Sequence, residues 1–486
     1  MRQLDPYIND LPNISGAEKI IEESISQRPE NVFLQHSDIN FNNIRSACAI
    51  ALHMHQPLIP AGGDNLQTAQ LIGNLQDMMD HQDIGDNHNA PVFLWCYRRM
   101  AELIPQLVHE GKSPRVMLEY SGTLLHGLWQ MGHQDVINDL RTITCDPAYF
   151  PKVEWLGAPW GHAVAPSTPV QDYRLHVKAW QQHFAALFGF EALNRVKGFS
   201  PSEMALPNQP DVAYEFVKTL KDCGFQWVLV QEHSVEQPQD GYTPQRQHLP
   251  HRLVCTNSQG ETVSIIAIIK TQGSDTKLVA QMQPYYEAQG LERWELAGHS
   301  VPPVVTQIAD GENGGVMMNE FPPKFQEAVR QSSGTDTPLV NISEYLEYLF
   351  SIGIKENDLP VLQPVKQKAI WDRFKAGDGP EKMQQVIEQL KKQDHQFHME
   401  GGSWTNELSW VKGYDDVLSD MEKTSSLFNQ KVLQKGVATD NPAYRNALYN
   451  LLSSQTSCYR YWGQGLWTDY GKEICRRTQA IIENDF

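Results

Sequence analysis

The stretch ACAIALHMHQP, at residues 47–57, joins an uninterrupted apolar run to a cluster of polar side chains. The run Ala47–Leu52 predicts a strand that is buried on both faces, as strands of parallel sheets are. The polar residues begin at His53, where this strand would end. Six later runs have a similar character and predict further strands: Val116–Glu119, Val153–Leu156, Arg195–Phe199, Trp227–Val230, Ser264–Ile269 and Val304–Ile308.

Helical patterns lie between these runs. Apolar residues recur at spacings of three and four in Val92–His109, Gln171–Phe188 and Val212–Cys223. Alternating strands and helices predict an α/β fold built on a parallel sheet or barrel. After about residue 340 the strand signals fade, and helical patterns dominate at Ser343–Ser351, Pro380–Gln393, Asp415–Gln434, Pro442–Ser454 and Lys472–Asn484.

These patterns divide the chain into three parts. Residues 1–44 are polar, contain one predicted helix at Ala17–Ser26, and are interpreted as an N-terminal extension. Residues 45–340 carry the strands and residues 341–486 form a helical C-terminal region. The polar stretch Glu236–His251 predicts a long loop.

Composition restricts the partners. The 486 residues include 40 Lys and Arg against 58 Asp and Glu, a formal charge of −18, which argues against a nucleic acid or an anionic membrane as the partner. The longest apolar runs are too short to span a bilayer, and the N-terminus has no secretory signal. Seven scattered cysteines without a CxxC pair suit a reducing compartment, so we expect a cytoplasmic protein.

Polar residues follow every predicted strand. Because the carboxyl ends of barrel strands surround one active site, the joint pattern predicts a single polar cleft, although polar residues are also expected wherever a strand reaches solvent. The residues in question are His53, His55 and Gln56, then Glu119, Tyr120 and Ser121, Trp160 and His162, Ser200, Ser202 and Glu203, Gln231, Glu232 and His233, Thr271, Gln272 and Asp275, and Asp310 and Glu312.

Two carboxylates in this set have a suitable setting for catalysis. Glu203 lies in the turn GFSPSEM after the fourth run, and Asp310 directly follows the seventh, in IADGENGG. Two carboxyl groups that face each other across a cleft are the equipment of glycoside hydrolysis. With 58 acidic residues in the chain, the pair alone is a weak signal.

The His53-Met54-His55 pair is open to three interpretations. Residues i and i+2 of a strand point the same way, so both imidazoles can bind one metal with a third ligand such as His162, Asp310 or His233. They can instead hydrogen-bond sugar hydroxyls, together with Gln56. They can also simply satisfy each other at the rim of the barrel.

Two aromatic clusters occur late in the chain. The first is around Trp404 and the second, SCYRYWGQGLWTDY, includes Trp462. Aromatic rings stack on sugar rings, but packing of the helical region on the barrel explains them equally well.

Together these motifs resemble glycoside hydrolase family 57, whose members act on α-glucans with an incomplete seven-stranded (β/α) barrel and a helical C-terminal region. HMHQP at residues 53–57 is similar to the family's opening motif, Gly161-His162-Ala163 to its second, Gly198–Glu203 to its third and Asp310-Gly311-Glu312 to its fourth. The resemblance implies that Glu203 is the nucleophile and Asp310 the general acid/base of a retaining enzyme without metal or cofactor. It also implies an α-glucan or maltooligosaccharide as the substrate, with His53, His55 and His162 as sugar contacts and Trp404 or Trp462 in a fifth motif. From their places at the strand ends we also expect substrate contacts from Gln56, Tyr120, Glu232 and Glu312.

The sequence departs from the family pattern at two motifs. Ser200 stands where the third motif usually has Trp, and Asn313 and Gly314 replace the usual residues of the fourth. Two other functions therefore remain open: a metal-dependent polysaccharide deacetylase, and a relative that binds α-glucan without catalysis.

Overall fold

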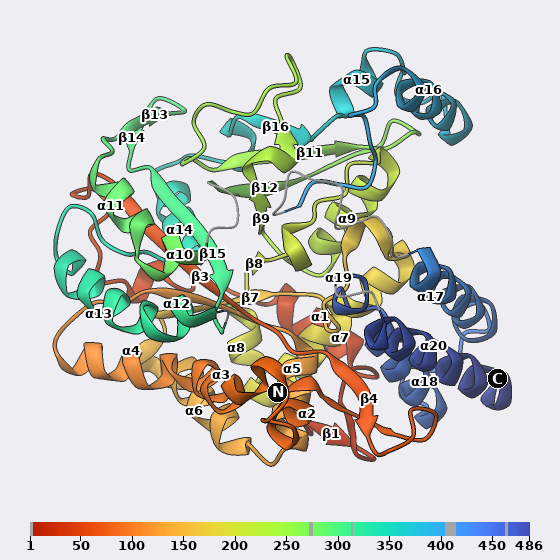
Figure 1. Ribbon diagram of the computed structural model, residues 1–486. Helices are drawn as coiled ribbons and strands as arrows, with labels where there is room; N and C mark the ends of the chain where they lie inside the picture. The colour runs from red at the N-terminus through yellow and green to blue at the C-terminus, as the bar shows by residue number, and fades with distance from the viewer. Residues whose placement is uncertain (1–2, 272–275, 313, 404–414, 462–464) are drawn as a thin grey trace.

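Seven parallel strands close into a barrel. The computed structural model describes residues 3–271, 276–312, 314–403, 415–461 and 465–486 (Figure 1). Going around the barrel, each strand pairs with the next, and the last pairs with the first. The strands are β3 (Ala47–Met54), β6 (Val116–Tyr120), β7 (Val153–Gly157), β8 (Gly198–Phe199), β9 (Trp227–Gln231), β12 (Thr262–Lys270) and β15 (Val304–Asp310).

The seven predicted runs therefore correspond to the seven barrel strands, with one correction. The run Arg195–Phe199 contains a strand only at Gly198–Phe199, because Arg195 still ends the helix α8 (Phe190–Asn194). Gly198 is required here, since a β-carbon at this position would lie 2.2 Å from the Trp227 ring. The buried Trp227 indole uses that space and donates to the Ser343 hydroxyl at 2.9 Å.

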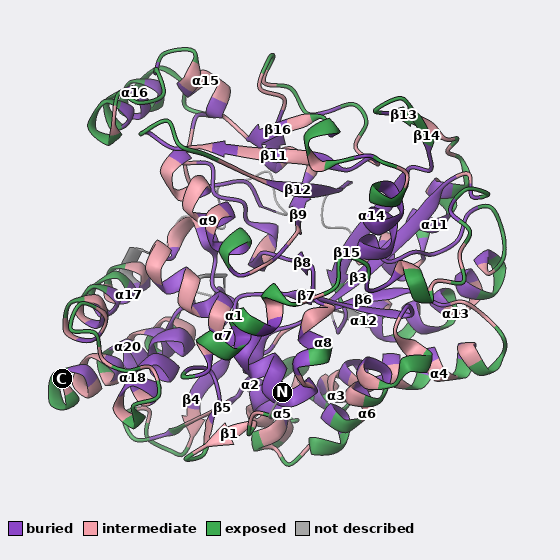
Figure 2. Cartoon of the chain, turned by 180° about the vertical axis from the view of Figure 1, so that it is seen from behind, coloured by how far each residue is buried: buried purple, intermediate pink, exposed green. Residues whose placement is uncertain are grey.

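The core has an inner and an outer layer, because successive side chains of a strand point to opposite faces. Along β3, Ala47, Ala49 and Ala51 belong to the inner layer, whereas Cys48, Ile50 and Leu52 pack against the surrounding helices. Figure 2 shows the buried strands enclosed by helices whose outer faces are exposed.

The surrounding helices agree closely with the predicted ones. Six helices overlap a predicted stretch over most or all of its length: α1 (Glu18–Ser26), α7 (Val170–Phe188), α9 (Pro210–Asp222), α16 (Pro380–Gln393), α18 (Pro442–Ser454) and α20 (Leu466–Asp485). The stretch 92–109 is divided at Arg99 into α3 (Ala90–Arg98) and α4 (Met100–His109), and the stretch 415–434 is α17 (Asp415–Phe428) followed by a π-helical turn, Asn429–Leu433.

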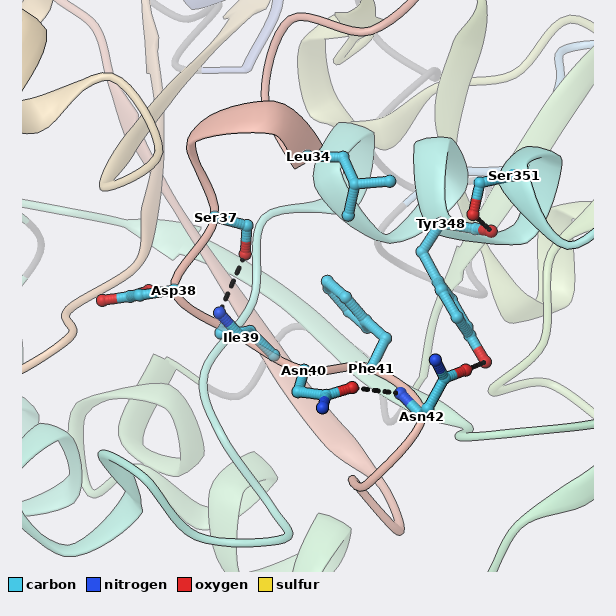
Figure 3. Close-up of a pocket in the computed structure, with 9 residues that line it drawn as sticks. All are labelled: Leu34, Ser37, Asp38, Ile39, Asn40, Phe41, Asn42, Tyr348 and Ser351. Atoms are coloured by element: carbon cyan, nitrogen blue, oxygen red, sulfur yellow. Dashed lines mark hydrogen bonds between the residues drawn. The ribbon is translucent and has the colours of Figure 1, made fainter.

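The helix α14 (Ile342–Ser351) fills the barrel at the amino ends of its strands. Its residues Ile342, Tyr345, Leu346 and Leu349 belong to the inner core layer. Beside it lies a surface pocket of about 400 Å³, lined by residues 34 and 37–42 together with Tyr348 and Ser351 of α14 (Figure 3). This pocket is at the end of the barrel opposite to the polar cluster predicted from the sequence, because Asp38 in its lining pairs with Arg115 and Lys152, which precede β6 and β7.

Residues 3–44 pack against the barrel and α14. The side chain of Phe33 is fully buried, and the Glu347 carboxylate of α14 accepts hydrogen bonds from the backbone N–H groups of Val32, Phe33 and Leu34. Lys197, which precedes β8, forms a buried ion pair with the same carboxylate at 2.9 Å.

Several further strands were not predicted. β11 (His251–Thr256) pairs antiparallel with β12, β16 (Val361–Pro364) joins β11, and β10 (Val235–Glu236) joins β16, so a sheet extends outward from the barrel. Among the described residues, none of the helices combines the length and the apolar character needed to cross a membrane.

The C-terminal helices α17, α18 and α20 pack on one another and lie to one side of the barrel (Figure 1). The hairpin formed by β4 (Leu58–Gly62) and β5 (Gln70–Gly73) contacts α20. Between α18 and α20, the short helix α19 (Cys458–Tyr461) turns the chain toward the carboxyl ends of the barrel strands.

Candidate active site

The carboxyl ends of neighbouring strands bring the predicted site residues together. His53 lies in register with Asp310 on one side and with Glu119 on the other. Strand geometry alone therefore aligns an imidazole between two carboxylates.

His53 is held as a cation. Its Nδ1 is hydrogen-bonded to the buried Glu119 carboxylate. Burial disfavours the charged imidazole, but the charge and hydrogen bond of Glu119, together with the charges of Asp310 and Glu312, outweigh it and raise the pKa of His53 to about 10. At neutral pH, His53 therefore presents a positive charge close to Asp310.

His55 and His162 are neutral. Burial and the nearby charge of His53 lower the pKa of His55, and burial together with the other histidines lowers that of His162, both well below the ordinary value. The His55 and His162 rings stack with centroids 4.0 Å apart, and His53 and His162 stack at 4.7 Å.

The stacking bears on the metal interpretation. Ring nitrogens bind a metal through lone pairs in the ring plane, and rings that lie face to face at 17° and 29° do not direct those lone pairs to one point. The Nδ1 atom of His53 is occupied by Glu119, and that of His55 lies 2.8 Å from the Ser121 hydroxyl. Within the described part of the chain, no group of three or more metal-ligating side chains has suitable geometry.

Glu203 lies on a short 3-10 turn, Ser202–Met204, that follows β8. Its backbone is left-handed, with φ of 58°, which is uncommon for a residue other than glycine. One carboxylate oxygen, Oε1, accepts a hydrogen bond of 2.9 Å from the Ser457 hydroxyl and lies 3.9 Å from Nδ1 of His162. Its side chain is 17% exposed, so it remains accessible to solvent.

The C-terminal region supplies three side chains that sequence reasoning did not assign to the site. Ser457 contacts Glu203 and His162, while Thr456 and Cys458 contact Nε2 of His55 at 3.4 and 3.3 Å. The only signal in the sequence was that Ser457 and Cys458 begin the second aromatic cluster, in which the aromatic rings were the predicted sugar contacts.

Asp310 ends β15 and is exposed, whereas Glu312, two residues later, is buried. Glu312 Oε1 accepts hydrogen bonds from the His55 backbone N–H at 3.2 Å and from the Tyr97 hydroxyl at 3.3 Å. Burial, followed by repulsion from Asp310, raises the pKa of Glu312 to about 7. Glu312 thus supports the backbone at His55.

Two of the predicted substrate contacts lie in the wall of the site. Tyr120 is fully buried and its hydroxyl donates to the Tyr97 carbonyl at 2.7 Å, because alternation along β6 turns Tyr120 away from the side that Glu119 faces. Gln56 donates to the Tyr97 hydroxyl and accepts from Asn74, so it acts behind Glu312. We assign neither a sugar contact.

Of the remaining predicted substrate contacts, Glu232 is described by the structure and the two tryptophans are not. Glu232 is half-buried at the end of β9, and its charge and that of Asp310 act on Lys270 at the end of β12. Burial nevertheless lowers the pKa of Lys270 to about 8. Lys270 was not predicted, because it closes an apolar run as an ordinary strand-end lysine would. Trp404 and Trp462, like Gln272, Asp275 and Asn313, lie outside the described residues.

The sequence also matches a known protein family. The sequence profile of glycosyl hydrolase family 57 matches residues 49–351, which is more than half of the chain. The chain belongs to glycosyl hydrolase family 57. Membership makes it an enzyme of the glycoside hydrolase class, and the match begins in β3 and ends with α14. No curated protein matches the sequence.

Several solved structures share the fold of this chain. A 4-α-glucanotransferase from Thermococcus litoralis is 16% identical with a TM-score of 0.56, and the match covers 91% of this chain but only 60% of that one. A family 57 branching enzyme from Pyrococcus horikoshii is 12% identical with a TM-score of 0.51, over 90% of this chain and 88% of that one. An α-amylase from Thermotoga maritima is 10% identical with a TM-score of 0.50, over 91% and 93%. At these identities the likeness shows the fold alone.

Proposed function

We propose that this family 57 enzyme cleaves or transfers α-glucosidic linkages of α-glucans or maltooligosaccharides through a glycosyl-enzyme intermediate. Glu203 is the nucleophile and Asp310 the general acid/base. We propose no nucleic acid or membrane as a partner. We place the enzyme in the cytoplasm, because a reducing compartment keeps its seven cysteines as free thiols.

One observation carries the assignment: two of the histidines, His162 and His53, connect the two carboxylates. Glu203 is 3.9 Å from His162, the His162 ring stacks on His53, and His53 is paired in register with Asp310. The two carboxyl groups therefore line the same end of the barrel, at the carboxyl ends of β8 and β15, where parallel barrels place their active sites.

The proposed reaction follows the two-carboxylate mechanism. Asp310 gives its proton to the glycosidic oxygen while a Glu203 oxygen attacks the anomeric carbon, so one C–O bond breaks as another forms. Asp310 then accepts a proton from water or from a sugar hydroxyl, whose oxygen displaces Glu203. The choice between water and sugar separates hydrolysis from transfer.

The protonation states support distinct roles for the histidines. The charged His53, in register with Asp310, places a positive charge beside that carboxyl, which suits the stage of the reaction at which Asp310 has given up its proton. His55 and His162 are neutral, so neither is an imidazolium that could give a proton to the Glu203 carboxylate. A nucleophilic carboxylate benefits from remaining ionised.

We retain the three-part division of the chain as a proposal, with one change of boundary. Residues 1–44 and the helical region stay as separate parts. The boundary at 340 separates α14 from the inner core to which its side chains belong, so we propose that the barrel unit extends through Ser351.

The test is incubation of the protein with maltooligosaccharides and with amylose, followed by separation of the products by size. Chains that become both longer and shorter indicate transfer, and shorter chains alone indicate hydrolysis. Either activity should be lost in Glu203→Ala and in the isosteric Glu203→Gln, and retained in Glu295→Ala, which changes an exposed residue of the strand Trp294–Leu296.

The alternatives predict other results. Full activity of Glu203→Gln would contradict the assignment of the nucleophile. Binding of α-glucan without turnover by the unaltered protein would favour the non-catalytic relative. Stoichiometric zinc that is lost in His53→Ala would favour the deacetylase.

A further inference from the structure

The segment 455–458 docks the C-terminal region onto the loop after β7. The Ser457 backbone N–H donates to the His162 carbonyl at 3.0 Å, and Thr456 forms an isolated antiparallel bridge with Ala163. Gln455 bonds His176 at 3.0 Å and Asp172 at 2.6 Å, both from α7. These contacts hold Ser457, which is 2% exposed, in one place.

The Ser457 hydroxyl lies between His162 and Glu203. Its Oγ is 2.7 Å from His162 Nδ1 and donates to Glu203 Oε1 at 2.9 Å. The direct separation between His162 Nδ1 and Glu203 Oε1, at 3.9 Å, is too long for a hydrogen bond. The hydroxyl therefore bridges two groups that do not bond each other.

The number of protons determines the direction of these bonds. A serine hydroxyl has one hydrogen, and here the carboxylate receives it. His162 Nδ1 must then carry the hydrogen that it shares with Ser457 Oγ. A neutral imidazole has only one N–H, so Nε2 of His162 is left as an acceptor, and this buried atom has no hydrogen-bond partner among the described residues.

Both partners of Ser457 have a strained backbone. His162 has φ of 57° and Glu203 has φ of 58°, each in the left-handed region. Non-glycine residues persist in this region only when their surroundings hold them there, and such residues cluster at functional sites. Ser457 holds His162 through both its backbone and its side chain, and holds Glu203 through its side chain.

We propose that Ser457 is a positioning residue for the nucleophile. It orients the Glu203 carboxylate, and it fixes His162 in the tautomer that carries its hydrogen on Nδ1 and none on the buried Nε2. The barrel thus carries the carboxylates, and the C-terminal region completes their arrangement. The inference rests on the proposed role of Glu203.

The kinetic test compares Ser457→Ala with Ser457→Thr, which keeps the hydroxyl. A hydrogen bond to a charged group changes an equilibrium by roughly ten- to a hundred-fold, so we expect kcat of Ser457→Ala to fall by about that factor with a small change in KM. Ser457→Thr should recover most of the rate. The control is Ser453→Ala, because the equally buried Ser453 hydroxyl donates to the Tyr449 carbonyl within α18.

The pH profile separates positioning from packing. The ionisable groups near Glu203 include His162 and the Cys458 thiol, and His55 lies behind them. Loss of the hydroxyl removes a donor that favours the carboxylate form, so the acidic limb of kcat/KM should move to higher pH by about one to two units. A uniform loss with an unmoved limb would overturn the proposal.

A second readout does not need substrate. Nitrogen NMR of the histidine side chains, assigned by comparison with His162→Gln, should show His162 protonated at Nδ1 in the unaltered protein and a changed tautomer in Ser457→Ala. A proton on Nε2 in the unaltered protein, or the same spectrum in Ser457→Ala, would contradict the bridge. If the protein turns over no α-glucan yet shows the expected spectra, the proposed function fails while the Ser457 bridge stands.

Discussion

At the scale of single residues, the partner of each histidine decides its charge. His53 faces the buried Glu119 carboxylate and is protonated, whereas His55 and His162 face hydroxyls and are neutral. All three rings lie within a few ångströms of one another, so burial alone does not explain the difference. The Glu119 carboxylate on the neighbouring strand β6 makes the main difference, with smaller contributions from Asp310 and Glu312.

This pairing predicts how the stability depends on pH. Because the pKa of His53 is about 10 in the folded protein and near 6.5 when unfolded, its contribution to stability is fully present below pH 6.5 and is lost as the pH rises to about 10. Glu119→Gln removes the cause of the raised pKa. The difference in unfolding free energy between the unaltered protein and this variant should therefore be largest near pH 6 and shrink toward pH 10, as measured by urea unfolding.

The control is Glu295→Gln, because Glu295 is exposed and belongs to a two-stranded hairpin, Trp294–Val301, that is not part of the barrel sheet. Its difference from the unaltered protein should not change over the same range of pH. A Glu119→Gln difference that is constant from pH 6 to 10 would show that Glu119 does not stabilise a protonated His53.

At the scale of elements, α14 closes the barrel with ions as well as with apolar side chains. Its Glu347 carboxylate accepts three backbone N–H groups of residues 32–34 and pairs with Lys197. Both members of the pair are almost fully buried, so each needs the other. Residues 32–34 are in this way fastened to α14, which comes after β15 and the helices α12 (Gly314–Asn319) and α13 (Phe321–Ser332) in the chain.

Glu347→Gln should therefore be costly. The substitution leaves the buried Lys197 ammonium without its carboxylate, which destabilises a fold by about 3 to 5 kcal/mol. Urea unfolding measures the loss, and limited proteolysis should cut near residues 30–36 before it cuts elsewhere. Glu327→Gln, in the exposed pair with Lys324 on the helix Phe321–Ser332, should leave the unfolding curve unchanged. Equal curves for both variants would mean that the buried pair contributes no stability.

At the scale of the whole molecule, the site belongs to two parts of the chain. The carboxylates and histidines come from the barrel, and Thr456, Ser457 and Cys458 come from the C-terminal helices. The two parts also share an apolar contact, because Leu448, Tyr449, Leu451 and Leu452 of α18 belong to the same core as α5 (Gly122–Gln130) and α7.

A fragment that ends at Ser351 should therefore not behave as a folded domain, although it contains all of the family match. Removal of α18 exposes apolar side chains of α5 and α7, and large exposed apolar patches lead to association. We expect aggregation in size-exclusion chromatography and binding of a hydrophobic dye, with the full chain as the control. A monomeric fragment that does not bind the dye would show that the barrel is independent.

The sequence by itself determined the barrel and the ring of polar residues at its mouth. Continuous apolar runs alternate with helical periodicity, and in a parallel barrel all strands deliver the residues that follow them to one end. For this reason Glu203, Asp310 and the histidines could be named as one site before any coordinates. The short strand Gly198–Phe199 was overestimated, since the preceding helix competes for its first residues.

Only the tertiary structure decided how the site residues are protonated and held. Ser457 lies 254 positions from Glu203 and 295 from His162, and no local pattern reports contacts over such distances. The charge of His53, the neutrality of His162 and the burial of Tyr120 depend on which side chains face one another across the fold. Burial and hydrogen bonding act through space, and the chain order does not contain that information in a periodic form.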